Sequence, residues 1–163
     1  MELMYIFKLN NLPFLNVFFI GQMILLGLFY NSLLKLKSQK IFVKVSIVVA
    51  LLILIIQCAL DPSQFLKFNM FEIALTCLLI VVFALFHLYN MLTEAKMYYY
   101  ASIGIIIYLF ASTVLFLIGN LSFSLSEDLK YLIWTLNAFL ALAYQFFILY
   151  EWKVSFYNKS LRP

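Results

Sequence analysis

Five long apolar runs limit what this chain can form more than any other feature of its sequence. An α-helix of about 20 apolar residues is long enough to cross the hydrocarbon core of a bilayer. The runs cover residues 12–34, 41–60, 70–92, 98–119 and 131–150. Because backbone groups without partners are costly in lipid, each run is predicted to be one continuous helix. The expected fold class is all-α, a polytopic transmembrane helix bundle with five spanning helices.

The composition is also that of a membrane protein and not of a soluble domain. Of the 163 residues, 66% are hydrophobic and 11% are charged, whereas soluble domains are about 45–50% apolar and about 25% charged. A water-soluble fold is therefore excluded, and residues 1–163 are predicted to form a single integral membrane domain. The basic residues behind the net charge of +4 are scattered along the chain. No nucleic-acid partner is expected, and the lipid bilayer is the expected environment.

Lysine and arginine in short connections predict the orientation, because these residues are held back on the cytoplasmic side during insertion. One side of the predicted topology carries Lys35, Lys37, Lys40, Lys44, Lys96, Lys153, Lys159 and Arg162, and the other carries Lys8, Lys67 and Lys130. The N-terminus is therefore predicted to lie outside and the C-terminus in the cytoplasm.

Polar residues inside the runs indicate which helix faces avoid lipid. Each run contributes one polar residue to a layer in the outer half of the membrane, namely Asn16, Gln57, Thr76, Ser112 and Asn137. One interpretation is a ligand-binding pocket open to the outside, because interhelical hydrogen bonds contribute only about 0.6 kcal/mol each and packing alone does not require so many. The other interpretation is that these groups only tie the helices together.

The third run carries a polar stripe along one helix face, and this predicts that the third helix is the most enclosed. The stripe consists of Glu72, Thr76, Phe83, His87, Asn90 and Glu94. His87 and Gln145 are assigned to an inner polar layer, where a hydrogen-bonded core histidine is the favoured interpretation. Glu72 lies within a turn of the outer interface and faces either the lipid headgroups or the helix N-terminus.

Neither catalysis nor metal binding is expected from these residues. His87 is the only histidine, and Cys58 and Cys77 form no CxxC pair. Metal sites and catalytic dyads need a second ligand or a charged partner, which the spacing does not supply. We therefore expect no metal, no cofactor and no catalytic residues.

Small and polar residues recur at helical spacing and predict packing faces, because they let helix backbones approach in lipid. The faces are Asn16, Met23, Gly27 and Tyr30 in the first helix, Ala101, Gly104, Tyr108, Ala111 and Ser112 in the fourth, and Asn137, Ala141 and Gln145 in the fifth. Ser124 and Glu127 form a predicted capping box before the fifth helix.

Several segments together resemble an uncharacterised family of small bacterial multi-pass inner-membrane proteins with five to seven helices. The segments are residues 10–15 (NNLPFL), 28–34, Phe68-Asn69 and 83–92, the set Tyr99-Tyr100, Gly104, Tyr108, Ser112, Phe116 and Asn120, and Trp134 and Trp152. The resemblance implies a bacterial inner membrane as the location, and relatives with two further N-terminal helices.

The chain departs from that family at positions where ionisable residues are common. Asn16 and Gln22 stand where a histidine and a glutamate are usual, Thr76 stands where a glutamate often occurs, and a histidine is usual near Asn137. These neutral residues argue against a proton-linked or ion-linked role.

Four classes of function remain open from the sequence. The favoured class is a non-enzymatic receptor-like or accessory signalling protein. The second is a subunit of a small-solute transporter or pore, although an inverted repeat is not evident in five helices. The third is an intramembrane enzyme, which would need a paired constellation of residues that the sequence does not show. The fourth is a structural subunit of a membrane complex. The expected protein partner is another membrane protein or a second copy of the chain.

Overall fold

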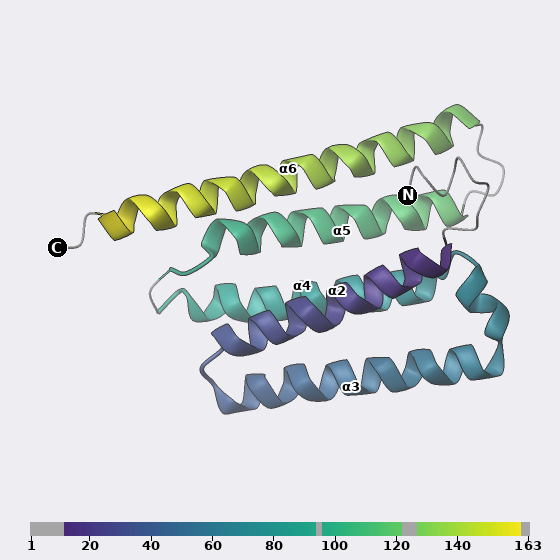
Figure 1. Cartoon of the computed structure of the whole chain (residues 1–163), viewed down its shortest axis with the longest axis horizontal. Coiled ribbons are helices and arrows are strands. Elements are labelled where there is room, and N and C mark those ends of the chain that lie inside the picture. The colour runs from purple at the N-terminus through teal and green to yellow at the C-terminus, as the bar shows by residue number, and fades with distance from the viewer. Residues whose placement is uncertain (1–11, 94–95, 122–126, 161–163) are drawn as a thin grey trace. The chain divides into compact units, whose positions relative to one another are not determined.

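A computed structural model confirms the all-α fold, and its described residues form five helices long and apolar enough to span a membrane. The structure describes residues 12–93, 96–121 and 127–160. In chain order the elements are α2 (Leu12–Leu33), α3 (Lys37–Leu60), the short 3₁₀ helix η1 (Pro62–Leu66), α4 (Met70–Asn90), α5 (Tyr99–Leu121) and α6 (Glu127–Ser160), as Figure 1 shows.

Two helices extend at least four residues beyond the predicted apolar runs. α3 begins at Lys37 instead of residue 41, and α6 covers Glu127–Ser160 instead of 131–150. Hydropathy detects only the apolar part of a helix, whereas backbone hydrogen bonding continues through polar residues such as lysine and glutamate that favour helices. Ser124 of the predicted capping box and Glu94 of the predicted stripe lie outside the described residues.

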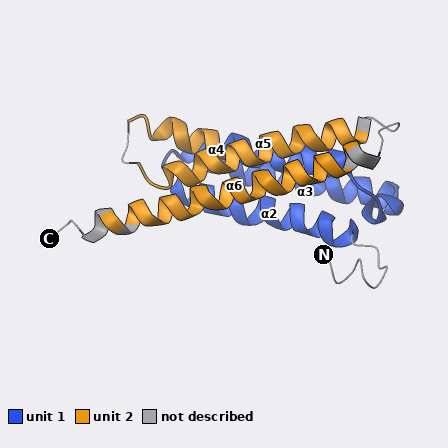
Figure 2. Ribbon diagram, turned by 90° about the horizontal axis from the view of Figure 1, so that it is seen from above, with its two compact units in different colours: residues 1–83 blue, residues 84–163 orange. Residues whose placement is uncertain are grey.

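The chain divides into two compact units, which Figure 2 shows in different colours. Unit 1 covers Met1–Phe83 and unit 2 covers Ala84–Pro163, so the boundary lies within α4. That residues 1–163 form a single integral membrane domain stays a prediction.

In unit 1, α2 packs against α3, and η1 contacts both helices. Gly27 lies close to neighbouring side chains, since a Cβ atom there would lie 2.6 Å from Ile47 Cδ1 and 3.4 Å from the Phe83 ring. All members of the predicted packing face of α2 are buried, namely Asn16, Met23, Gly27 and Tyr30. The prediction of that face is confirmed.

In unit 2, α5 and α6 pack as an antiparallel pair. Residues of α5 at intervals of four meet residues of α6 whose numbers fall as those of α5 rise. The contacts are Tyr100 with Tyr150, Gly104 with Phe147, Tyr108 with Tyr144, Ser112 with Asn137, and Phe116 with Trp134. The predicted face of the fourth helix is therefore the surface that contacts α6.

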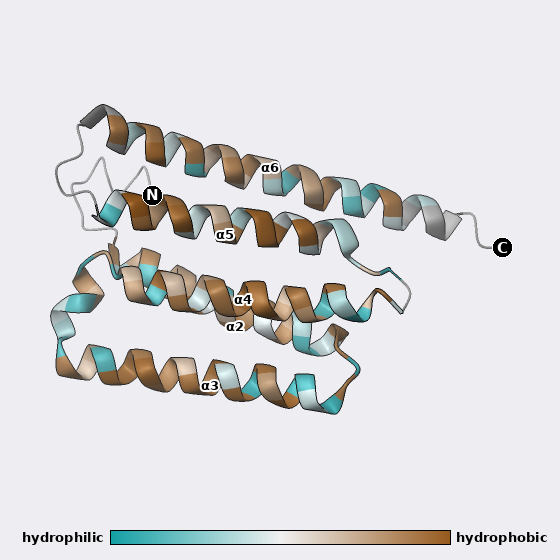
Figure 3. Cartoon of the chain, turned by 180° about the vertical axis from the view of Figure 1, so that it is seen from behind, coloured by the Kyte–Doolittle hydropathy of each residue, from teal (hydrophilic) through white to brown (hydrophobic). Residues whose placement is uncertain are grey.

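The exposed surface of both units is strongly apolar. Figure 3 shows hydrophobic residues along the length of the helices and hydrophilic residues mainly toward their ends. Half of the residues in the apolar window of α4 are buried, a larger share than in any of the other four spans. This agrees with the prediction that the third helix is the most enclosed.

Candidate functional site

The turn between α3 and α4 is built around Asp61. Its carboxylate accepts hydrogen bonds from the Ser63 backbone N–H at 3.1 Å, the Ser63 hydroxyl at 2.7 Å and the Gln64 side-chain amide at 2.8 Å. Pro62 follows in the first turn of η1, where a missing N–H costs nothing. This sequence therefore ends α3 and starts η1 within one residue.

These hydrogen bonds make the turn sensitive to acid. The Ser63 hydroxyl and then the Gln64 amide, which donate to the carboxylate, hold the pKa of Asp61 below its usual value. A carboxyl with a lowered pKa in the folded state stabilises that state above its unfolded pKa, and the stabilisation disappears as pH falls through the folded pKa. We expect the Ser63 amide to lose protection from hydrogen exchange below about pH 4, and Asp61→Asn to have lost that pH dependence. Protection that persists unchanged in strong acid would contradict this.

Asn16 ties α2 to this turn. Its side chain is fully buried, and Nδ2 donates to the backbone carbonyls of Phe65 at 3.0 Å and Lys67 at 3.3 Å. The amide thus supplies donors to two backbone groups at the C-terminal end of η1, which the helix itself does not satisfy. Asn16 therefore positions η1 against α2.

Asn69 caps α4 and orients Glu72. The Asn69 Oδ1 accepts the Glu72 backbone N–H at 3.2 Å, and its Nδ2 lies 3.5 Å from Glu72 Oε2. The Asn69 amide also pairs with the Gln57 amide through two contacts of 3.4 Å. This arrangement resembles a capping box, in which a cap and the residue three positions later satisfy each other.

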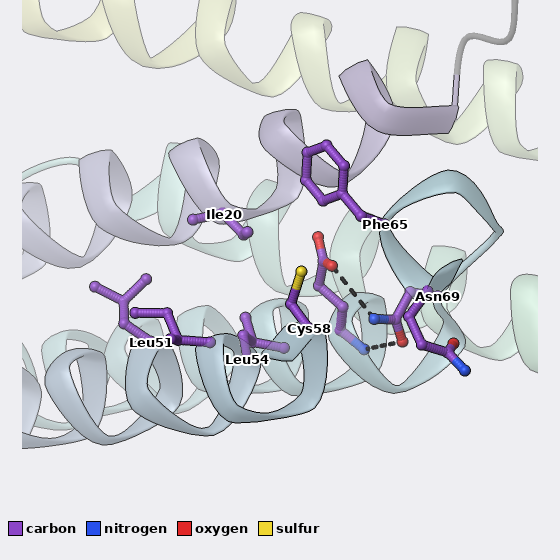
Figure 4. Close-up of a pocket in the computed structure, with 9 residues that line it drawn as sticks. Ile20, Leu51, Leu54, Cys58, Phe65 and Asn69 are labelled. Atoms are coloured by element: carbon purple, nitrogen blue, oxygen red, sulfur yellow. Dashed lines mark hydrogen bonds between the residues drawn. The ribbon is translucent and has the colours of Figure 1, made fainter. Parts of the chain in front are cut away.

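A cavity of about 200 Å³ lies beside this cap. Its walls come from α2, α3, η1 and the start of α4, and consist of Ile20, Leu51, Leu54, Ile55, Cys58, Gln64, Phe65, Asn69 and Glu72. Figure 4 shows Leu51, Leu54 and Cys58 on one side, with Ile20 and Phe65 across from them, and the two hydrogen bonds between Asn69 and Glu72 as dashed lines. The cavity is an apolar space with polar groups gathered at one end.

Glu72 is the group of this cavity with unused hydrogen-bonding capacity. Its side chain is 4% exposed, and its Oε1 is buried without a hydrogen-bond partner. The sequence predicted that Glu72 faces either the lipid headgroups or the N-terminus of its helix. The structure shows a carboxyl group in the first turn of α4 that is also buried in the wall of a cavity.

The predicted outer layer divides between the two units. Asn16, Gln57 and Thr76 belong to unit 1, and Ser112 and Asn137 to unit 2. Thr76 is fully buried, but its hydroxyl donates to its own helix, at 2.8 Å from the Glu72 carbonyl. The Ser112 hydroxyl donates to Asn137 Oδ1 across α5 and α6. That all five residues line one pocket stays a prediction.

His87 and Gln145, the two residues of the predicted inner layer, both belong to unit 2, and that they form one layer stays a prediction. His87 is buried and its Nε2 lies 2.8 Å from the Met97 carbonyl, to which it donates, because a carbonyl oxygen can only accept. This bond joins α4 to the turn before α5, where Tyr98 has a left-handed φ of 54°. Gln145 is exposed on α6.

Glu151 is a site residue that sequence reasoning missed. Its buried carboxylate accepts the Tyr100 backbone N–H at 2.8 Å and the Ser155 hydroxyl at 3.2 Å. It therefore caps the first turn of α5 from the neighbouring helix, where a negative charge is stabilised by the helix dipole. No local pattern in the sequence signals this contact, because it follows from the antiparallel register that brings the end of α6 beside the start of α5.

The cavity residues were missed for a different reason. Leu51 and Cys58 look like ordinary members of an apolar run, and only their position in the packed unit makes them part of a wall. The pattern Asn69-x-x-Glu72 did carry a signal, because an asparagine followed three residues later by a glutamate favours a helix start.

Among the described residues, no group of three His, Cys, Asp or Glu side chains is placed to hold a metal ion. No family model, curated protein or solved structure matches the chain. The fold and its apolar surface define the class, a multi-pass integral membrane protein.

Proposed function

We propose that this chain is a non-enzymatic receptor-like protein, or an accessory signalling component, that takes a small ligand into the cavity of unit 1. The buried oxygen of Glu72 that lacks a partner in the cavity wall carries this proposal. Cavities with mainly apolar walls and a few polar groups are the usual sites for small ligands. An ionisable residue buried in a spanning helix also indicates function, because it is costly to retain.

The contacts of the cavity suggest how an occupied state differs from an empty one. Phe65 forms part of the wall, and its backbone carbonyl accepts the hydrogen bond from Asn16. A ligand against Phe65 therefore acts on η1, the segment that joins α3 to α4. If the ligand binds more tightly when η1 is in one position than in another, its binding shifts η1 toward the first position.

The proposed setting is the bacterial inner membrane, with the N-terminus outside and the C-terminus in the cytoplasm. This orientation places η1 and the cavity at the outer side of the membrane. The movement of η1 would be transmitted to a partner membrane protein or to a second copy of the chain. Membership of the small multi-pass family is part of the same proposal. The continuity of all five span-length helices supports a receptor over a transporter, whose sites are commonly built from broken helices.

Labelling of Cys58 tests the side from which the cavity is reached. Cys58 lines the cavity and is exposed, whereas Cys77 is 2% exposed. We expect a membrane-impermeant maleimide to label the chain in right-side-out vesicles and not in inverted ones, because thiol reactivity requires access. Cys58→Ala should remove the label and Cys77→Ala should keep it. Labelling of Cys58 only in inverted vesicles would overturn the proposal of an external ligand.

A further inference from the structure

We infer that the ligand of this cavity is a small apolar primary amine, an assignment that rests on the ligand-binding function proposed above. Its ammonium group pairs with the Glu72 carboxylate, and its hydrocarbon part fills the space beside Leu51, Leu54 and Ile20.

The unpaired polar atoms near the site are hydrogen-bond acceptors, so a ligand has to supply a hydrogen-bond donor. The buried side-chain polar atoms without a partner, in the part of the chain that is described, are all acceptor oxygens: Asn16 Oδ1, Gln22 Oε1, Asn31 Oδ1 and Glu72 Oε1. Of these residues only Glu72 lines the cavity. A ligand that presents further acceptors, such as a phosphate or a carboxylate, would leave that oxygen unsatisfied and add like charge. The site therefore selects for a hydrogen-bond donor.

The charge of Glu72 favours a cationic donor over a neutral one. A buried carboxylate is costly unless it is paired, and no described Lys or Arg side chain is part of the cavity wall. A hydrogen bond between two charged groups is about twice as strong as one between neutral groups. An ammonium group supplies both the missing charge and the missing donor.

The volume and the apolar lining of the cavity, which is open on the side where Ile55 and Cys58 are exposed, favour a small apolar group for the rest of the ligand. A protein cavity of about 150 Å³ holds one benzene molecule, so about 200 Å³ suits a ligand of about eight non-hydrogen atoms. The walls away from Glu72 are formed by Ile20, Leu51, Leu54 and Ile55. A bare metal ion would leave this apolar space unfilled and would lack the six or more oxygen ligands that calcium takes. A ring or short chain with one amino group meets both requirements.

Benzylamine is a suitable probe, with benzyl alcohol as a neutral probe of the same size. In the purified full-length chain in detergent, we expect benzylamine to raise the unfolding temperature and to slow maleimide labelling of Cys58. Glu72→Gln keeps the shape of the side chain and removes its charge. We expect this variant to bind benzylamine about 10- to 100-fold more weakly, the range for loss of a hydrogen bond to a charged group, and to bind benzyl alcohol as the wild type does.

Unchanged binding of benzyl alcohol shows that the Glu72→Gln variant is folded, and a pair of leucine substitutions tests where the probe binds. Leu51 lines the cavity, whereas its neighbour Leu52 does not and is 53% exposed. Leu51→Phe should abolish the benzylamine-dependent rise in unfolding temperature, and Leu52→Phe should keep it.

The outcomes separate this inference from the proposed function. Equal binding of benzyl alcohol and benzylamine, unchanged by Glu72→Gln, would overturn the amine assignment and leave a small-ligand cavity in place. The absence of any response to either probe, in a chain whose Cys58 is labelled from outside, would overturn the inference alone. Labelling of Cys58 only from the cytoplasmic side would overturn the proposed function, whatever the probes do.

Discussion

Replacement of Gly104 by alanine is expected to loosen the contact between α5 and α6 and to destabilise the chain by about 1–3 kcal/mol, the usual cost of overpacking. A Cβ atom at this position would lie 2.6 Å from Phe147 Cβ and 2.8 Å from Phe147 Cγ. The first of these atoms is attached directly to the helix backbone, so a rotation of the phenyl ring does not relieve the clash. One of the two helices has to move.

Two other glycines supply matched controls for Gly104→Ala. A Cβ at Gly21 would meet nothing within 4 Å, and a Cβ at Gly119 would lie 3.4 Å from Ile133 Cδ1. Alanine favours the helix by up to about 1 kcal/mol over glycine, so Gly21→Ala should be neutral or stabilising, and Gly119→Ala should change stability little. Thermal unfolding in detergent, followed by circular dichroism, measures all three variants. Equal stability of Gly104→Ala and Gly21→Ala would refute the close approach of the two helices.

Asn16→Leu is the second change for which we expect a large effect. Leucine keeps a similar volume but removes the donor to the Phe65 and Lys67 carbonyls. A buried acceptor left without a partner costs about 1–3 kcal/mol. We expect a loss of stability in that range and faster hydrogen exchange in η1, because the segment is no longer held against α2.

Gln22→Leu is the control in the same helix. The Gln22 Oε1 is buried without a partner, so leucine there removes an unsatisfied acceptor and should leave stability unchanged or slightly raised. If Asn16→Leu and Gln22→Leu had the same effect, the asparagine would be only a helix-packing residue, and the link from the cavity to η1 would be lost.

Several residues on which the proposed family membership rests form one helix face in unit 2. Tyr100, Gly104, Tyr108, Ser112 and Phe116 lie four residues apart on α5, and each contacts α6. Intervals of four keep side chains on one helix face. The pattern therefore describes a helix–helix interface.

Periodicity and hydropathy were enough to predict the five spans and the packing faces of α2 and α5. Both are local properties: the length of an apolar run matches the thickness of a bilayer, and small residues such as Gly27 and Gly104 allow close approach wherever they lie. The same reasoning detected Glu72 and Asn16 as polar residues that avoid lipid. Their hydrogen-bond partners could not be predicted in this way.

The partners depend on which segments of the chain meet. Asn16 bonds to Phe65 and Lys67, about fifty residues away, and Glu151 caps α5 at Tyr100, also about fifty residues away. Neither set of hydrogen bonds can be recognised from a periodic pattern in the sequence, because both depend on the register in which the helices pack. The cavity likewise arises where Leu51, Cys58 and Phe65 fail to fill the space between them. A void depends on the shapes of all the side chains around it, so packing alone made Glu72 the candidate ligand-binding residue of this protein.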